Sequence, residues 1–63
     1  MYVLKDSFEA KKRNCPVYLK DMSGIGPVYT ESLDEAKKFE TKEDAMMSPA
    51  FNYSLCFFYP EEI

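Results

Sequence analysis

The segment Asp21–Pro27, which reads Asp-Met-Ser-Gly-Ile-Gly-Pro, carries both glycines of the 63-residue chain and one of its four prolines. Glycine and proline clustered in this way are the strongest turn signal in the sequence, so the backbone must bend here. An apolar run, Cys15–Lys20, precedes the turn, and residues 28–29 follow it as a brief strand. Gly24 and Gly26 also resemble the opening of a phosphate-binding loop, but no further glycine or Gly-Lys-Ser/Thr follows, so the pattern favours a turn.

The N-terminal run Tyr2–Lys5 is short, apolar and β-prone, and it predicts a hairpin with Cys15–Lys20. The charged connection Phe8–Asn14 is longer than a tight two-residue turn, so the register of this hairpin must come from its buried side chains. Pro16 has no N–H to donate, which places it at the start of a strand or on an edge.

Two helix-start signals follow the turn. Ser32 and Glu35 have the spacing of a capping box, and the apolar residues Leu33, Ala36 and Phe39 recur on one helical face, which predicts a short amphipathic helix.

The second signal is Thr41, which can cap a further helical turn. Glu43 and Asp44 place negative charge at the positive end of its dipole. Residues 45–47 supply its apolar surface, and Pro49 is expected to end it.

The segment Tyr53–Tyr59 is the most β-prone stretch of the chain and is closed by Pro60, so it predicts the third main strand. Side chains alternate between the two faces of a strand, and we expect one face to meet the helices and the other to present Phe58. The alternation groups Tyr53, Leu55, Phe57 and Tyr59 on one face and Ser54, Cys56 and Phe58 on the other.

Together these elements predict an α+β fold. We expect a small three- to four-stranded antiparallel sheet with one or two short helices packed on one face, in the chain order β-β-α-α-β. A chain of 63 residues allows one domain, so residues 1–63 are expected to form a single small α+β domain.

Charge and hydropathy narrow the classes of function. Eleven Asp and Glu against eight Lys and Arg give a net charge of -3, which argues against nucleic acid as a partner. No apolar run approaches the roughly 18 residues of a membrane span, and the N-terminus lacks a secretory signal pattern, so we expect a soluble intracellular protein with no membrane contact. Lys11, Lys12 and Arg13 form a basic run, typical of a solvated loop, with a phosphate- or acid-binding patch as the alternative.

The residues that usually carry catalysis and metal binding are sparse. Histidine is absent, and Cys15 and Cys56 lie far apart with no C-x-x-C pair. The sequence therefore predicts no enzyme, no cofactor and no metal site. Two free thiols acting as small apolar residues are favoured, a single disulfide being the alternative.

Five Tyr and five Phe among 63 residues exceed what two short helices on a small sheet can hide. We therefore expect some rings to be buried against another chain, either a partner protein or a second copy in a homo-oligomer. An aromatic strand edge could add a strand to a partner's sheet or act as an anchor. The expected anchors are Tyr18, Phe57, Phe58 and Tyr59, and the expected charged rim is Lys11, Lys12 and Arg13.

The pattern Leu-x-x-Ala-x-x-Phe-x-Thr-x-x-x-Ala is carried here by Leu33, Ala36, Phe39, Thr41 and Ala45. With the preceding strands, over about residues 2 to 45, it resembles small uncharacterised proteins of tailed bacteriophages. The resemblance implies a phage-encoded protein that binds and modulates or inhibits a host protein in the cytoplasm of the infected bacterium. The motif itself is structural, and the segment from Met46 onward departs from it.

Two other functions are compatible with the sequence. One is an oligomeric nucleotide-binding sponge, in which lysines and aromatic rings hold a nucleotide at an interface. The other is an acidic DNA mimic or nucleic-acid accessory protein, whose carboxylates would be Glu31, Asp34, Glu35, Glu40, Glu43 and Asp44.

Overall fold

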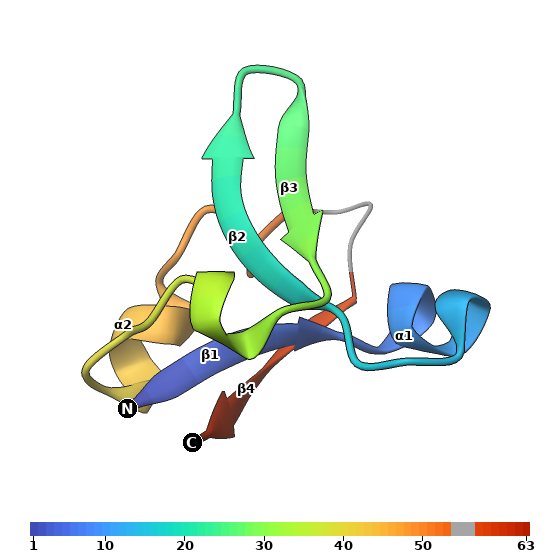
Figure 1. The fold of residues 1–63 in the computed structure, drawn as a ribbon. Helices are drawn as coiled ribbons and strands as arrows, with labels where there is room; N and C mark the ends of the chain where they lie inside the picture. Colours follow the sequence, from blue (N-terminus) through green and yellow to red (C-terminus); the bar gives the residue numbers. More distant parts are fainter. Residues whose placement is uncertain (54–56) are drawn as a thin grey trace.

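A computed structural model describes residues 1–53 and 57–63, and it confirms the α+β class. Four antiparallel strands form one sheet in the order β3-β2-β1-β4, accompanied by short helices (Figure 1). Three residues of the predicted third strand, Ser54, Leu55 and Cys56, lie outside the described part. The elements are β1 (Tyr2–Asp6), α1 (Ser7–Arg13), β2 (Tyr18–Ser23), β3 (Gly26–Thr30), the 3-10 helix η1 (Leu33–Glu35), α2 (Lys42–Met46) and β4 (Phe58–Glu62).

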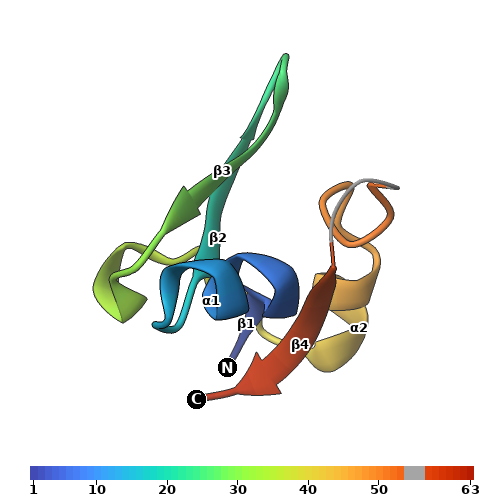
Figure 2. The same cartoon turned by 90° about the vertical axis from the view of Figure 1, so that its right-hand side faces the viewer.

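The two halves of the sheet diverge. The β2–β3 hairpin projects from the body of the molecule, whereas β1 and β4 lie beside α2 (Figure 2). β1 and β2 pair at a single position, Lys5 opposite Tyr18. The segment after η1 bonds to both β2 and β1. Lys37 N–H donates to the carbonyl of Leu19 at 2.9 Å, and Phe39 exchanges two backbone hydrogen bonds of 2.8 Å with Tyr2.

The connection between β1 and β2 is a helix, so the prediction of a charged loop over Phe8–Asn14 is wrong. Asp6 is the N-cap of α1, and its carboxylate accepts the N–H of Glu9 at 2.8 Å. Basic residues fill the last turn, where cations stabilise the helix dipole. Asn14 ends the helix in the left-handed conformation, with φ 58°.

The turn predicted within Asp21–Pro27 is confirmed and is tight. Ser23 pairs with Gly26 across two residues, and the hydroxyl of Ser23 donates to the carbonyl of Gly26 at 2.9 Å. Gly26 has φ 134°, a backbone conformation that residues with a side chain rarely adopt. The brief strand expected at residues 28–29 is confirmed as part of β3.

The helix predicted to start at Ser32 is wrong beyond its first turn. Ser32 makes no side-chain cap, and the chain leaves η1 at Ala36 in an extended conformation. Glu35 instead accepts the Thr30 hydroxyl at 3.1 Å, while Lys38 donates to the carbonyls of Leu33 and Ala36 at 2.7 and 2.8 Å. Contacts with β1, β2 and β3, together with the Lys38 ammonium group, therefore replace the hydrogen bonds of a longer helix.

The second helical signal is confirmed. Thr41 caps α2 by accepting the N–H of Asp44 at 3.0 Å, and the helix ends at Met46, before Pro49.

β4 starts later than predicted, at Phe58, and includes Pro60 rather than stopping before it. The expectation that the Phe58 face is exposed is also wrong. Phe58 is 8% exposed and stacks on Tyr29 with ring centroids 5.8 Å apart. Its neighbours Phe57 and Tyr59 face solvent, so the alternation holds with its faces exchanged.

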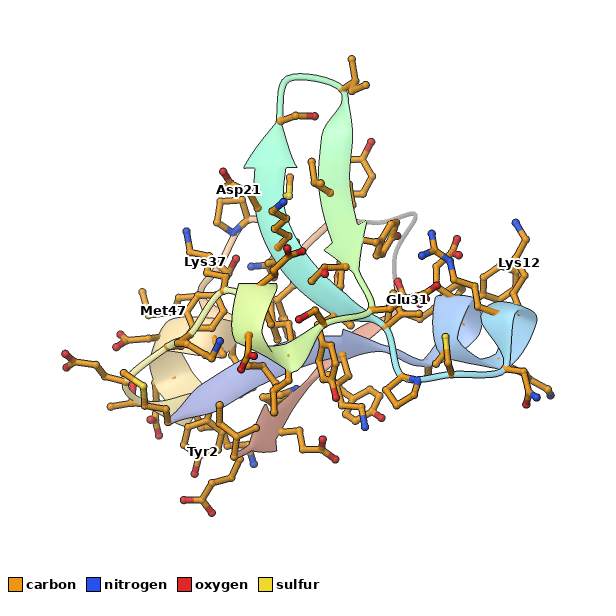
Figure 3. The ribbon with its side chains drawn as sticks, viewed as in Figure 1. Tyr2, Lys12, Asp21, Glu31, Lys37 and Met47 are labelled. Carbon is orange, nitrogen blue, oxygen red and sulfur yellow. The ribbon has the colours of Figure 1, made fainter. Side chains whose placement is uncertain are left out.

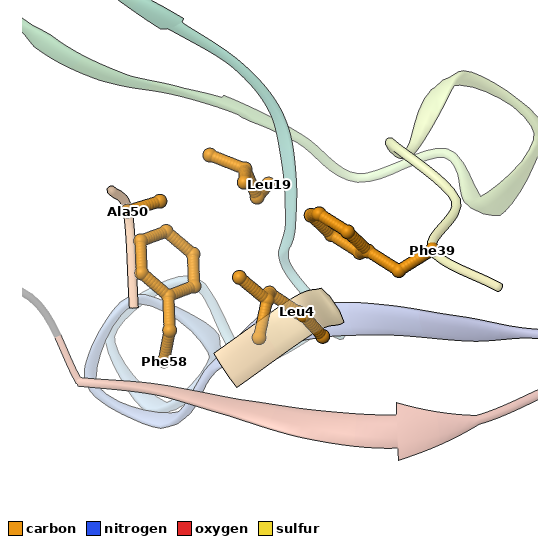
Figure 4. Packing of buried hydrophobic residues seen from close by; sticks show 6 residues of the cluster. Leu4, Leu19, Phe39, Ala50 and Phe58 are labelled. Atoms are coloured by element: carbon orange, nitrogen blue, oxygen red, sulfur yellow. The ribbon is translucent and has the colours of Figure 1, made fainter. Parts of the chain in front are cut away.

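The core lies on the face of the sheet that carries Phe58 (Figure 4). Aliphatic side chains from the central strands meet one ring from β4 and one from the segment after η1. Its buried members are Leu4, Leu19, Phe39, Ala45, Ala50 and Phe58.

Both edge strands contain a proline, Pro27 in β3 and Pro60 in β4. Residues 7 and 57 are joined by a backbone hydrogen bond, as are residues 63 and 1. Hydrogen-bonded and non-hydrogen-bonded pairs alternate along antiparallel strands, so every second residue pair between these two is also hydrogen-bonded. Pro60, opposite Leu4, falls between such pairs. Its nitrogen therefore faces outward and removes a donor from the free edge, which disfavours pairing with another strand.

Replacing Asp6 by Ala is expected to lower the free energy of unfolding by about 2 kcal/mol. The change removes the helix cap and the hydrogen bond that the Tyr29 hydroxyl donates to Asp6 at 3.3 Å. Urea denaturation followed by circular dichroism measures it. Asp34→Ala, at an exposed carboxylate, is the matched control, and equal stability of the two variants would contradict the role of Asp6.

Replacing Pro60 by Val is expected to promote self-association, because it restores the missing donor on the free edge of β4. Light scattering after size-exclusion chromatography, over a range of protein concentrations, measures the molar mass. Pro49→Val, at an exposed proline outside the sheet, is the control. An unchanged mass in both variants would show that Pro60 does not protect the edge.

Candidate functional site

A row of side chains crosses the sheet on the face opposite the core, here called the outer face. Lys5 is paired with Tyr18 on β2 and with Tyr59 on β4, so the lysine lies between two tyrosines. Its ammonium group is 5.8 Å from the centre of the Tyr18 ring. Lys5 also forms an ion pair of 3.1 Å with Glu61, and this hydrogen bond raises the pKa of the lysine.

Two phenylalanines continue the aromatic row towards α1. Phe57 and Phe8 are each 58% exposed, and their ring centroids are 5.6 Å apart. The carbonyl of Phe57 accepts the backbone N–H of Ser7 at 3.1 Å, which fixes the start of α1 beside the start of β4. We call the set Phe8, Tyr18, Phe57 and Tyr59 the aromatic surface.

The structure brings together three of the four predicted anchors. Tyr59 is 41% exposed, Tyr18 is half-buried, and Phe57 is the most exposed of the three. Phe58 belongs to the core instead, because it lies on the opposite side of β4. Sequence reasoning missed Phe8, since it lay in a presumed loop. The signal for α1 was present as Asp6 and Glu9 at capping-box spacing.

The predicted basic rim divides into two parts. Lys11 and Lys12 are exposed, and they form no ion pair within residues 1–53 and 57–63. Arg13 is engaged with Glu9 and Glu31, each at 3.3 Å, and its guanidinium carbon is 5.7 Å from the centre of the Tyr29 ring.

The carboxylates proposed for DNA mimicry are partly neutralised. Glu31 pairs with Arg13, and Glu35 lies 3.9 Å from the ammonium group of Lys20. These contacts lower the negative charge that the set presents to a partner.

Cys15 has a free thiol, and Cys56 lies outside the described residues. Partial burial, followed by the charge of Glu31, raises the pKa of the Cys15 thiol, which reduces its thiolate fraction at neutral pH.

Three kinds of feature are absent from the described part of the chain. It contains no group of three or more metal-binding side chains and no pocket. None of its helices is long and apolar enough to cross a membrane.

Other exposed apolar side chains lie away from the aromatic surface. Ile25 is at the tip of the β2–β3 hairpin and is almost fully exposed. Met47 follows α2, 78% exposed, and lies at the opposite end of the molecule from Lys12 (Figure 3). Single exposed apolar residues of this kind are common on protein surfaces and define no site by themselves.

Three comparisons with known proteins give no match for this chain, whether with protein-family models, curated proteins or solved structures.

The ion pair between Lys5 and Glu61 is expected to stabilise the fold below about pH 10.5, the ordinary pKa of lysine, and to lose that effect as the pH rises through the higher pKa of folded Lys5. Because Glu61 is half-exposed, the contribution is below about 1 kcal/mol. Urea denaturation of the wild type and of Glu61→Gln measures it at successive pH values. The two curves should converge as the pH rises through the raised pKa of folded Lys5, and a constant difference would contradict the assignment.

Proposed function

We propose that this protein is an interaction module that binds a partner protein through its aromatic surface. The observation that carries the proposal is the contact between two highly exposed phenylalanine rings, Phe8 and Phe57. The exposed Tyr59 lies on the same face of the sheet as Phe57. Clustered exposed rings are unusual on a monomer and are typical of the centre of a protein interface.

The backbone beneath the aromatic surface is held by hydrogen bonds, which favours tight binding. Phe57 is held by a backbone hydrogen bond to Ser7, and Tyr59 is held in the ladder with Lys5. Side chains that are already positioned lose less conformational entropy when a partner binds.

The resemblance to small phage proteins supports a bacterial host protein as the partner, bound in the cytoplasm of the infected cell. Four of the five motif residues have structural positions, and the fifth, Leu33, is 40% exposed. Phe39 and Ala45 belong to the core, Ala36 is buried, and Thr41 caps α2. These four residues therefore serve the scaffold, and the proposed binding surface consists of residues outside the motif.

Replacing Phe57 by Ser is expected to weaken partner binding at least tenfold, because a truncated central aromatic residue typically costs 2 kcal/mol or more. The measurement is capture of proteins from a bacterial lysate by the immobilised chain, followed by calorimetric titration of the captured protein. Met47→Ser is the matched control, since it also removes an exposed apolar side chain. Equal capture by wild type and Phe57→Ser would refute the aromatic surface as the binding site.

A further inference from the structure

The mode of docking follows from the strand edges. Pro60 removes a donor from the free edge of β4, and Pro27 lies in the other edge strand. A partner that extends the sheet needs a regular row of donors and acceptors, which these edges do not offer. The aromatic surface lies on the outer face, so a partner must lie across the sheet and not along its edge.

The exposed rings of the outer face lie at the end beside α1. Val3 lies two residues before Lys5 on the same face and is fully buried. Opposite Val3, the half-exposed Glu61 forms an ion pair with Lys5, so these two charges neutralise each other. The rings therefore have a neutral boundary on one side and α1 on the other.

The helix supplies the charge. Lys11 and Lys12 follow Phe8 by three and four residues, so both start from the helical face that carries the Phe8 ring. Because Arg13 is engaged by two carboxylates, the free positive charge beside the rings is that of the two lysines.

We propose, on the basis of the function proposed above, that the aromatic surface takes an acidic segment of its partner protein. An apolar side chain of that segment packs on the rings of Phe8 and Phe57. Its neighbouring carboxylates pair with the ammonium groups of Lys11 and Lys12.

Single-stranded nucleic acid also stacks on aromatic rings, but it brings a phosphate with every base. Two free lysines on a chain of net charge -3 compensate few phosphates. A protein segment with two or three carboxylates fits this number of cations better.

The test is selection of random 12-residue peptides on the immobilised full chain. The wild type is expected to enrich an aliphatic or aromatic residue flanked by Asp or Glu. The double variant Lys11→Glu, Lys12→Glu should bind the enriched peptide about tenfold more weakly and should itself enrich Lys and Arg in place of the acids. The double variant Lys11→Gln, Lys12→Gln places no anion at the negative end of the α1 dipole. It should weaken binding of the same peptide by a smaller factor.

Circular dichroism checks that both double variants fold. Enrichment of neutral or basic peptides by the wild type would overturn the proposal, as would equal affinity of the wild type and the Gln variant for the selected peptide. Tighter binding of a labelled dT12 oligonucleotide, in competition with the peptide, would also overturn it and favour nucleic acid. Lysate capture that depends on Phe57 but not on the lysines would refute this inference alone, whereas capture independent of Phe57 refutes the proposed function itself.

Discussion

The buried carboxylate of Asp6 is the interaction on which the rest of the fold depends. It stands where β1 becomes α1, caps the helix through Glu9, and accepts the hydroxyl of Tyr29 from β3. Its own N–H donates to the carbonyl of Val17 at 3.0 Å, which brings the chain back to the start of β2. One residue thus joins three strands and a helix. A buried carboxylate is tolerated because its oxygens have donors.

The aromatic surface is a consequence of this junction. Because the helix starts immediately after Asp6, the next two residues fall beside the start of β4. The N–H of Ser7 donates to the carbonyl of Phe57, and the ring of Phe8 contacts the ring of Phe57. The rings that would contact a partner are therefore held by the same short segment that organises the core.

Local signals predicted what local interactions decide. The glycine-rich turn, the cap at Thr41 and the fold class follow from residues near one another in sequence, and each is confirmed. Ser32 and Asp6 show the limit of such reasoning, since each has a Glu three residues later but only Asp6 caps an α-helix. At Ser32 the outcome depends on residues outside a helical turn. Thr30 bonds the side chain of Glu35, and Leu19 and Tyr2 bond the backbone of the segment that follows. The face that Phe58 occupies depends likewise on which side of the sheet the core forms, and alternation alone leaves both choices open.

The pairing of β1 with β4 bears on the order in which the molecule assembles. Met1 and Ile63 are joined by a backbone hydrogen bond of 2.9 Å, so a central strand obtains one of its two neighbours from the far end of the sequence. Such a closure is entropically slower than forming the β2–β3 hairpin, whose strands are separated by two residues. A nascent chain therefore holds β1 with one side unsatisfied until β4 has left the ribosome, and this interval is when it is most exposed to aggregation.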